Sequence, residues 1–266
     1  MGIFDGVLLC SDWDGSLSRG SAVPGEEVCP ENRAAIDYFQ KNGGLFTVCS
    51  GRYPAYILSF GEQVFPNTAL IALNGSLIVD PVSGETLREQ ILDPSLYPYL
   101  ERILDAFPHP VKFLQYPVGA SGAATYSRAE FREKIKTIEK TPCYKALLVT
   151  DDAEHGVLLR DLAREIVAGT VFEAARSWPI GLEFINRESN KGGAVRFLKE
   201  RTGADLLVTV GDYENDIPML TAADIGYAVA NATDDVKAAA DRVTKRKNSE
   251  GAVAEVIRDV ETARRS

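Results

Sequence analysis

Long apolar runs are missing from this sequence of 266 residues. None approaches the roughly 20 residues that a membrane-spanning helix requires. The first residues also lack the basic segment and apolar core of a secretory signal, and Asp12 would interrupt such a core. We therefore expect a cytoplasmic protein that does not act at a membrane.

Cysteine is scarce, and the spacing of the four cysteines does not suit a metal site. Cys10 and Cys49 lie within apolar segments that predict buried strands, where a free thiol packs as a small hydrophobic side chain. We expect all four, Cys10, Cys29, Cys49 and Cys143, to be reduced and inert. A redox role for Cys10 and Cys49 stays open, because both precede the polar motifs described below.

Basic side chains are outnumbered, with 29 lysine and arginine residues against 38 aspartate and glutamate residues and a formal net charge of −9. This balance opposes nonspecific attraction to the phosphate backbone of nucleic acids. A small phosphate ester is still a suitable partner, because a few well-placed cations decide that contact. We expect a small-molecule ligand and no nucleic acid.

Short apolar segments alternate with helical segments over the first 80 residues and again after about residue 188. This alternation predicts parallel strands joined by crossover helices. We expect an α/β core with a Rossmann-like, doubly wound parallel sheet, built from residues 1–80 and 188–266. The predicted core strands are 7–10, 45–49, 70–73, 206–210 and 225–229, and the predicted helices are 30–41, 55–64, 191–202, 216–223, 234–240 and one from 251 onward.

Residues 81–187 have a different pattern, which predicts an inserted α+β domain. Ligands of α/β sheets bind outside the carboxyl ends of the strands, so a domain inserted at a loop there would cover the site and select the substrate. The segments Tyr116–Tyr126 and Arg176–Trp178 are candidates for that selection, although their aromatic side chains suit a small domain core equally well. His109 and His155 lack a metal-like partner, and we expect them at the surface.

Four polar motifs follow apolar strands or open helices. Because the carboxyl ends of parallel strands meet at one edge of a sheet, we expect the motifs to converge there, although each alone is common in turns and helix caps. They are Asp12-Trp13-Asp14-Gly15-Ser16, Ser50-Gly51-Arg52, Asn190-Lys191-Gly192 and Gly211-Asp212-Tyr213-Glu214-Asn215-Asp216.

The converged motifs would supply what phosphoryl transfer needs: an in-line nucleophile, charge neutralisation and a proton donor. Asp12 is the candidate nucleophile, which would form an aspartyl-phosphate, and Asp14 is the candidate acid and base. Ser50 and Lys191 would contribute to catalysis by binding the phosphate oxygens, with the Gly51 amide beside them.

A hard divalent cation, Mg²⁺, is the expected cofactor, because the candidate ligands are all oxygens. Its predicted ligands are Asp12, the backbone carbonyl of Asp14, and Asp212, with Asp216 supporting them nearby. Arg52 follows Ser50 closely enough to lean into the site and bind substrate, but a structural ion pair explains it equally well.

In this order, the four motifs resemble those of the haloacid dehalogenase superfamily, and the resemblance covers essentially the whole chain. It is closer still to the Cof-like sugar-phosphatase branch, through Asn74-Gly75 after the third strand, the large inserted domain of type IIB, and Asn231-Ala232 before an acidic helix. Two residues depart from the usual pattern: Ser16 stands where the family has threonine and keeps the hydroxyl, and Trp13 replaces a smaller apolar residue.

The resemblance implies a Mg²⁺-dependent phosphatase that hydrolyses small phosphorylated metabolites, such as sugar phosphates, through an aspartyl-phosphate. It assigns Asn215 and Asp216 to the phosphate loop and metal shell, and places Asn74 at the substrate. Two alternatives are a phosphomutase of the phosphomannomutase kind and a catalytically silent sensor of a phosphorylated ligand. The cap residues that set specificity, the physiological substrate and the oligomeric state are not encoded in any motif of this chain.

Overall fold

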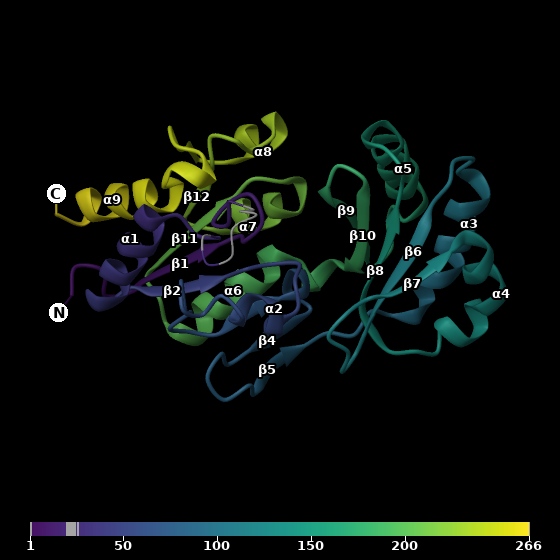
Figure 1. Cartoon of the computed structure of the whole chain (residues 1–266), viewed down its shortest axis with the longest axis horizontal. Coiled ribbons are helices and arrows are strands. Elements are labelled where there is room, and N and C mark those ends of the chain that lie inside the picture. The colour runs from purple at the N-terminus through teal and green to yellow at the C-terminus, as the bar shows by residue number, and fades with distance from the viewer. Residues whose placement is uncertain (1, 20–24, 26, 266) are drawn as a thin grey trace. The chain divides into compact units, whose positions relative to one another are not determined.

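A computed structural model describes residues 2–19, 25 and 27–265. The chain forms two compact units (Figure 1): residues 1–88 with 191–266, here called the core unit, and residues 89–190, here called the cap unit. No helix within the described residues is both long enough and apolar enough to span a membrane.

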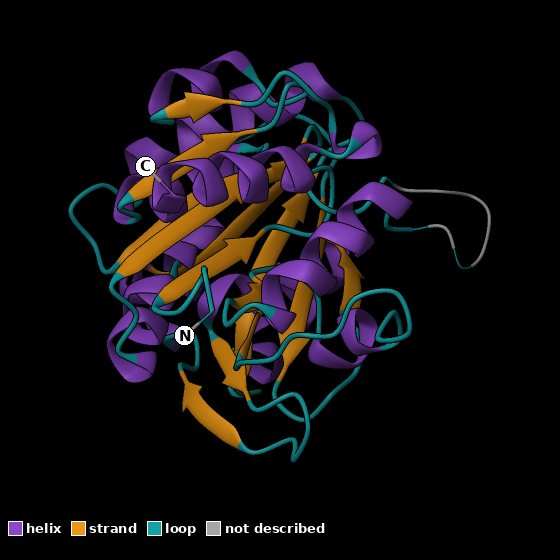
Figure 2. Ribbon diagram, turned by 90° about the vertical axis from the view of Figure 1, so that its left-hand side faces the viewer, coloured by secondary structure: helices purple, strands orange, loops and turns teal. Residues whose placement is uncertain are grey.

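The core unit contains a five-stranded sheet whose strand order is β13-β12-β11-β1-β2. All neighbouring strands in it are parallel, which confirms the predicted fold class. Helices lie on both sides of this sheet (Figure 2). Its strands are β1 (Val7–Ser11), β2 (Leu45–Val48), β11 (Leu206–Gly211), β12 (Ile225–Ala228) and β13 (Arg242–Val243).

The core helices pack in pairs, α1 against α9 and α6 against α7. Side chains from α6 and α7 pack with Leu8, Cys10 and Leu207 of the sheet in one apolar cluster. Because side chains alternate along a strand, the neighbours of these residues face the other side of the sheet. The helices are α1 (Pro30–Lys41), α2 (Pro54–Leu58), α6 (Lys191–Thr202), α7 (Ile217–Ala222), α8 (Asp234–Ala239) and α9 (Ala252–Arg265), and the single 3₁₀ turns are η4 (Glu214–Asp216) and η5 (Asn248–Glu250).

The third predicted strand, 70–73, belongs to a separate small sheet with the order β3-β4-β5. It is joined to the end of β2 by a parallel bridge between Cys49 and Ile71. β4 was not predicted, because it is only three residues long and follows the Asn74-Gly75 turn directly. The bounds are β3 (Leu70–Ala72), η1 (Leu73–Gly75), β4 (Leu77–Val79) and β5 (Thr86–Glu89).

The cap unit is an antiparallel sheet with the order β7-β6-β8-β10-β9. Three helices pack on it around an apolar cluster that includes Phe113, Phe131 and Phe184. The helix α4 begins with a capping box in which Ser127 and Glu130 satisfy each other's backbone amides. The strands are β6 (Lys112–Pro117), β7 (Ala124–Ser127), β8 (Cys143–Val149), β9 (Phe172–Trp178) and β10 (Gly181–Asn186), and the helices are η2 (Pro94–Leu96), α3 (Tyr97–Ala106), α4 (Arg128–Ile138), α5 (Ala153–Ile166) and η3 (Arg187–Ser189).

Candidate active site

The predicted motifs of the core unit meet beyond the carboxyl ends of its parallel strands. Asp12 continues directly from β1, and its amide donates to Val210 O of the neighbouring strand at 2.8 Å. Asp212 follows β11, and Lys191 is the first residue of α6. The convergence expected from the sequence is therefore present in the structure.

Lys191 is the centre of a buried charge cluster, with 1 % of its surface exposed. Its Nζ donates to Asp12 Oδ1 at 2.5 Å and to Asp216 Oδ1 at 2.6 Å. Burial disfavours the ammonium, but the two carboxylates outweigh burial and raise the pKa of Lys191 well above its usual value. The lysine therefore stays charged beside the candidate nucleophile.

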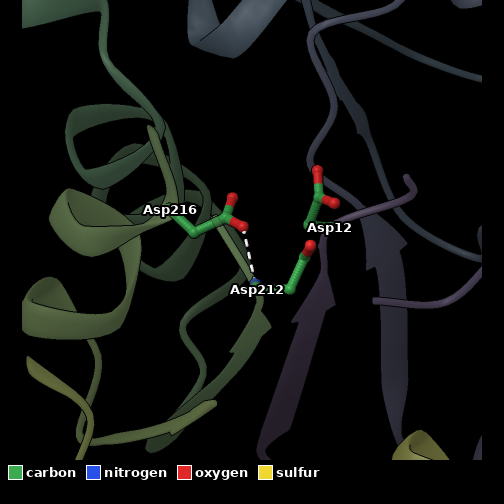
Figure 3. Close-up of side chains that lie close together, drawn as sticks. All are labelled: Asp12, Asp212 and Asp216. Atoms are coloured by element: carbon green, nitrogen blue, oxygen red, sulfur yellow. Dashed lines mark hydrogen bonds between the residues drawn. The ribbon is translucent and has the colours of Figure 1, made fainter. Parts of the chain in front are cut away.

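Asp216 uses its two carboxylate oxygens differently. While Oδ1 accepts from Lys191, Oδ2 accepts from the backbone amides of Asp212 at 2.9 Å and Tyr213 at 3.1 Å. The dashed line in Figure 3 marks the first of these two amide bonds. Asp216 thus shapes the turn that carries Asp212 and also holds Lys191 in place.

Asp12, Asp212 and Asp216 form a three-carboxylate cluster (Figure 3), with one ligand oxygen from each lying within 4.8 Å of the others. Burial, followed by the charge of Asp216, raises the pKa of Asp212 to about 7. Burial is also the main influence that raises the pKa of Asp12, and Lys191 opposes it. Oxygen donors that repel one another in a buried site fit a hard divalent cation.

Gly15 and Ser16 fit closely around Asp212. The Ser16 hydroxyl donates to Asp212 Oδ1 at 2.9 Å. Serine therefore keeps the hydroxyl group that threonine would provide at this position. Gly15 has a φ of +86°, and a Cβ there would lie 2.3 Å from Asp212 Oδ2. Asn231, quoted above only for its resemblance to the Cof-like pattern, donates from Nδ2 to Gly15 O at 2.8 Å and thereby supports this turn.

Arg52 forms an ion pair with Asp14, the candidate acid and base. Its Nε and one terminal nitrogen lie 2.9 and 3.0 Å from the two Asp14 oxygens. About half of each side chain is exposed. The guanidinium also lies over the Tyr56 ring, 4.8 Å from its centroid. Arg52 was expected either to bind substrate or to form a structural ion pair. The ion pair is present, and because its partner is Asp14 it places Arg52 at the candidate site.

Ser50 is fully buried, and its hydroxyl oxygen accepts from the Arg52 amide at 3.1 Å. Trp13, which stands in place of a smaller apolar residue, is also buried, and its ring stacks on Phe60 with a centroid distance of 5.0 Å. A packing role therefore accounts for Trp13.

Gly192, next to Lys191, approaches α7 so closely that a Cβ would lie 2.3 Å from Pro218 O.

The cysteines beside the site are poor nucleophiles. Cys10 and Cys49 are both fully buried. Burial raises the pKa of each thiol well above its usual value, and the neighbouring Cys49 adds to the effect on Cys10. Because the thiolate is the reactive form, these surroundings favour the inert role expected for them.

The cap unit contains a buried ion pair that the sequence reasoning missed. Lys145 Nζ lies 2.9 Å from Glu183 Oε1, which also accepts from the Ser177 hydroxyl at 2.8 Å. Lys145 lies under the ring of Tyr116, 4.5 Å from its centroid. The strands Cys143–Val149 and Gly181–Asn186 each contain one charged residue among mostly apolar ones. This pattern is the signal that could have identified Lys145 and Glu183 from the sequence.

The two cap histidines lie against each other, with ring centroids 3.7 Å apart. His155 Nδ1 also lies 2.9 Å from Asp152 Oδ2. Among the candidate specificity segments, Tyr126 packs on Phe113 of the cap cluster, while Tyr116 and Ser177 adjoin the Lys145–Glu183 pair. The end of the segment Tyr116–Tyr126 belongs to the edge strand β7 (Ala124–Ser127).

A family model described as haloacid dehalogenase-like hydrolase matches residues 9–257. The chain belongs to this family. The match confirms the resemblance to the haloacid dehalogenase superfamily and its Cof-like branch, and the protein is a phosphatase. It is 28% identical over 254 residues to the 5-amino-6-(5-phospho-D-ribitylamino)uracil phosphatase of Bacillus subtilis, covering 94% of this chain and 94% of that one.

Solved structures share the fold of the whole chain. A superfamily phosphatase from Bacteroides thetaiotaomicron has a TM-score of 0.75 at 19% identity, covering 97% of this chain and 96% of that one. A sugar phosphatase of subclass IIB has a TM-score of 0.73 at 17% identity, covering 95% and 98%. At these identities the comparison establishes the fold, while the chemistry is argued from the site.

Proposed function

We propose that this protein is a Mg²⁺-dependent phosphatase that hydrolyses small phosphomonoesters of the sugar-phosphate type through an aspartyl-phosphate. The observation that carries the proposal is the buried Lys191, which contacts both Asp12 and Asp216 while Asp212 lies in the same carboxylate cluster. A nucleophile, its counter-charge and a set of metal ligands are thereby joined in one cluster.

In the first step, an Asp12 oxygen attacks phosphorus and the bond to the leaving oxygen breaks. Asp14 gives that oxygen a proton. In the second step, Asp14 takes a proton from water as the water attacks phosphorus, and this releases inorganic phosphate and restores Asp12. The two displacements leave the enzyme unchanged and consume one water molecule.

The buried cation Lys191 offsets negative charge in both steps. Ser50, Gly51, Arg52 and Asn215 are the further groups proposed to bind phosphate or substrate. Arg52 already contacts Asp14, so it lies where the leaving group is to be protonated.

Mg²⁺ is the cation that we propose for the carboxylate cluster. Asp12, the Asp14 carbonyl and Asp212 would hold it, with Asp216 beside them, and it would supply positive charge to the phosphate oxygens. The raised pKa of Asp212 reflects a carboxylate that gains from a nearby cation. The proposed partner is a small phosphorylated metabolite in the cytoplasm, and the net charge of −9 disfavours nucleic acid.

Inorganic phosphate release from a panel of phosphorylated metabolites, with and without Mg²⁺, tests this function. We expect release that requires Mg²⁺ and falls at least about 10³-fold in Asp12→Asn, because the amide is not a nucleophile. Asp37→Asn, which changes an exposed aspartate paired with Lys41, is the matched control and should keep wild-type activity. Equal activity of Asp12→Asn and Asp37→Asn would refute the mechanism, and isomerisation of a hexose phosphate without release would indicate a mutase.

A further inference from the structure

Three consecutive residues after β3 have left-handed backbone conformations. Their φ angles are 51° for Leu73, 59° for Asn74 and 102° for Gly75. Within the described part of the chain, Leu73 and Asn74 are the non-glycine residues with positive φ. Both are buried, with 0 % and 2 % of their surfaces exposed. A leucine in this region is a backbone outlier, and such outliers persist only where the surroundings enforce them.

Closure of the β3–β4 hairpin does not require this conformation. Ala72 pairs with Leu77, which leaves residues 73, 74, 75 and 76 as the connection. Connections of about this length are most often built around an ordinary type I turn, whose two central residues have negative φ. The left-handed leucine and asparagine therefore call for a cause outside the hairpin.

The neighbouring contacts supply that cause. The Leu73 amide donates to Arg52 O at 3.1 Å, and the Asn74 amide donates to Ser50 O at 2.9 Å. In return, the Ser50 amide donates to Ile71 O at 2.9 Å. Residues 73–75, here called the clasp, thus hold the backbone on both sides of Gly51 in the loop that carries Ser50.

The clasp also contacts the other two parts of the proposed phosphate site. Asn215 Nδ2 donates to Asn74 Oδ1 at 3.3 Å, which ties the clasp to the turn between Asp212 and Asp216. The helix α6, which begins with Lys191, packs against residues 73–75. One strained segment therefore contacts the Ser50 loop, the Asn215 turn and the lysine helix.

We propose that Asn74 is a positioning residue, and that the clasp sets the spacing between Ser50, Asn215 and Lys191 so that one phosphate group meets all three. The ligand in this inference rests on the proposed function. Asn74 acts through its neighbours: its amide fixes the Ser50 carbonyl and its side chain fixes Asn215. The backbone strain is maintained because a relaxed turn would withdraw both amides from the Ser50 loop.

Two substitutions at this position separate the backbone contribution from that of the side chain. Asn74→Gly keeps a residue that adopts positive φ readily but removes the acceptor for Asn215, whereas Asn74→Ala removes the acceptor and adds strain. The probe is inorganic phosphate, measured as an inhibitor of Mg²⁺-dependent p-nitrophenyl phosphate hydrolysis. Thermal unfolding of each variant is measured in parallel.

We expect the inhibition constant for phosphate to rise about tenfold in Asn74→Gly, with a similar rise in KM and a smaller change in kcat. The reason is that Asn215 loses its hydrogen bond to Asn74 and no longer holds its position for phosphate binding. Asn74→Ala should show the same rise and a midpoint about 2–8 °C below that of Asn74→Gly. Combining Asn74→Gly with Asn215→Ala should add little beyond Asn215→Ala alone, since both remove the same contact.

Asn67→Ala is the matched control in the same unit. The Asn67 side chain accepts from the Phe46 amide at 2.7 Å and donates to Gly44 O at 2.9 Å, near the start of β2. This variant should lower the unfolding midpoint without changing phosphate inhibition. If Asn74 acted in folding alone, Asn74→Gly would likewise lower the unfolding midpoint without changing phosphate inhibition. That result would overturn the proposal.

Two further results would also overturn it: equal midpoints for the Gly and Ala variants, or independent effects of Asn74→Gly and Asn215→Ala. A wild-type protein that hydrolyses no phosphoester contradicts the proposed function instead. In that case the clasp is tested by the phosphate-dependent shift in unfolding midpoint with Mg²⁺ present, for the same variants.

Discussion

Two lysines are buried to the same extent, one in each unit, but their surroundings differ. Lys191 and Lys145 each have 1 % of their surface exposed. Lys191 meets two carboxylates where strands end and polar loops converge, whereas Lys145 meets one carboxylate and an aromatic ring within a sheet. Lys145 and Glu183 contribute one charge of each sign, while the core cluster, with three carboxylates beside Lys191, carries more negative charge than that lysine neutralises.

This difference separates two kinds of buried charge. Lys145 and Glu183 carry opposite charges, and their contact offsets one charge with the other. The core cluster, with Asp12, Asp212 and Asp216 around a single ammonium, has an uncompensated excess of negative charge that favours proton or cation uptake. The cap pair therefore suits a structural role and the core cluster suits a chemical one.

The largest effect is expected from breaking the cap pair. Lys145→Met removes the ammonium that lies 2.9 Å from the buried Glu183 carboxylate and should cost roughly 3–5 kcal/mol of unfolding free energy. Urea unfolding followed by circular dichroism measures this loss. Lys136→Met, at a side chain 80% exposed, is the control and should be near neutral. The double variant Lys145→Met/Glu183→Met should recover most of the loss, and failure to do so would contradict the assignment of the loss to the Lys145–Glu183 contact.

Breaking the core cluster should lower the rate of phosphate release. Lys191→Met removes a preorganised cation from the proposed phosphate site, so kcat/KM should fall about 10²–10³-fold, or roughly 2.7–4 kcal/mol of transition-state stabilisation. Steady-state phosphate release measures this fall, and the control is Lys199→Met, at a half-buried lysine of the same helix that pairs with Asp224. A Lys191→Met enzyme within threefold of wild type would show that this lysine is structural, like Lys145.

Mg²⁺ binding to the core carboxylate cluster is a further test of the difference between the two buried lysine sites. Mg²⁺ at about 100 times its Kd should stabilise the fold by about 2.7 kcal/mol, seen as a higher unfolding midpoint. The pKa of Asp212 is about 7, and Mg²⁺ binds the deprotonated form, so the shift should grow as the pH rises from 6 to 8. Asp212→Asn should largely abolish the shift and Asp37→Asn should keep it. Sodium chloride of equal ionic strength controls for screening.

The smallest effect is expected from the hydroxyl that orients Asp212. Ser16→Ala removes the 2.9 Å hydrogen bond to Oδ1 and should weaken Mg²⁺ binding about tenfold. Ser16→Thr keeps the hydroxyl and serves as the conservative comparison. Mg²⁺ titration of the unfolding midpoint distinguishes the two, and equal behaviour of the Ala and Thr variants would assign Ser16 to packing alone.

The sequence predicted the convergence of the core motifs because that step depends on local patterns. Apolar strands followed by Asp12, Ser50 and Asp212 place their side chains at one edge of any parallel sheet. The individual contacts were not predictable. The contact between Asp216 and Lys191, and the pairing of Arg52 with Asp14, depend on turn geometry that no spacing in the sequence determines.

The cap was harder to predict for two physical reasons. β7 is short, polar and partly exposed, so its composition resembles that of a loop. The Lys145–Glu183 pair depends on the register between β8 and β10, where Glu183 lies opposite Leu147, and register is a property of the folded sheet. Asn74-Gly75 was noted for its place after the third strand, but the left-handed conformation of Leu73 before it has no signal in the sequence.

The chain passes between the two units at two points, so the cap unit is one continuous segment of the sequence. The cap unit begins at Glu89 and ends at Asn190, and Lys191 is the first residue after it. Every proposed catalytic and metal-binding residue therefore lies outside the segment 89–190. Recombination at the two ends of this segment would exchange it whole and leave every proposed catalytic and metal-binding residue in place.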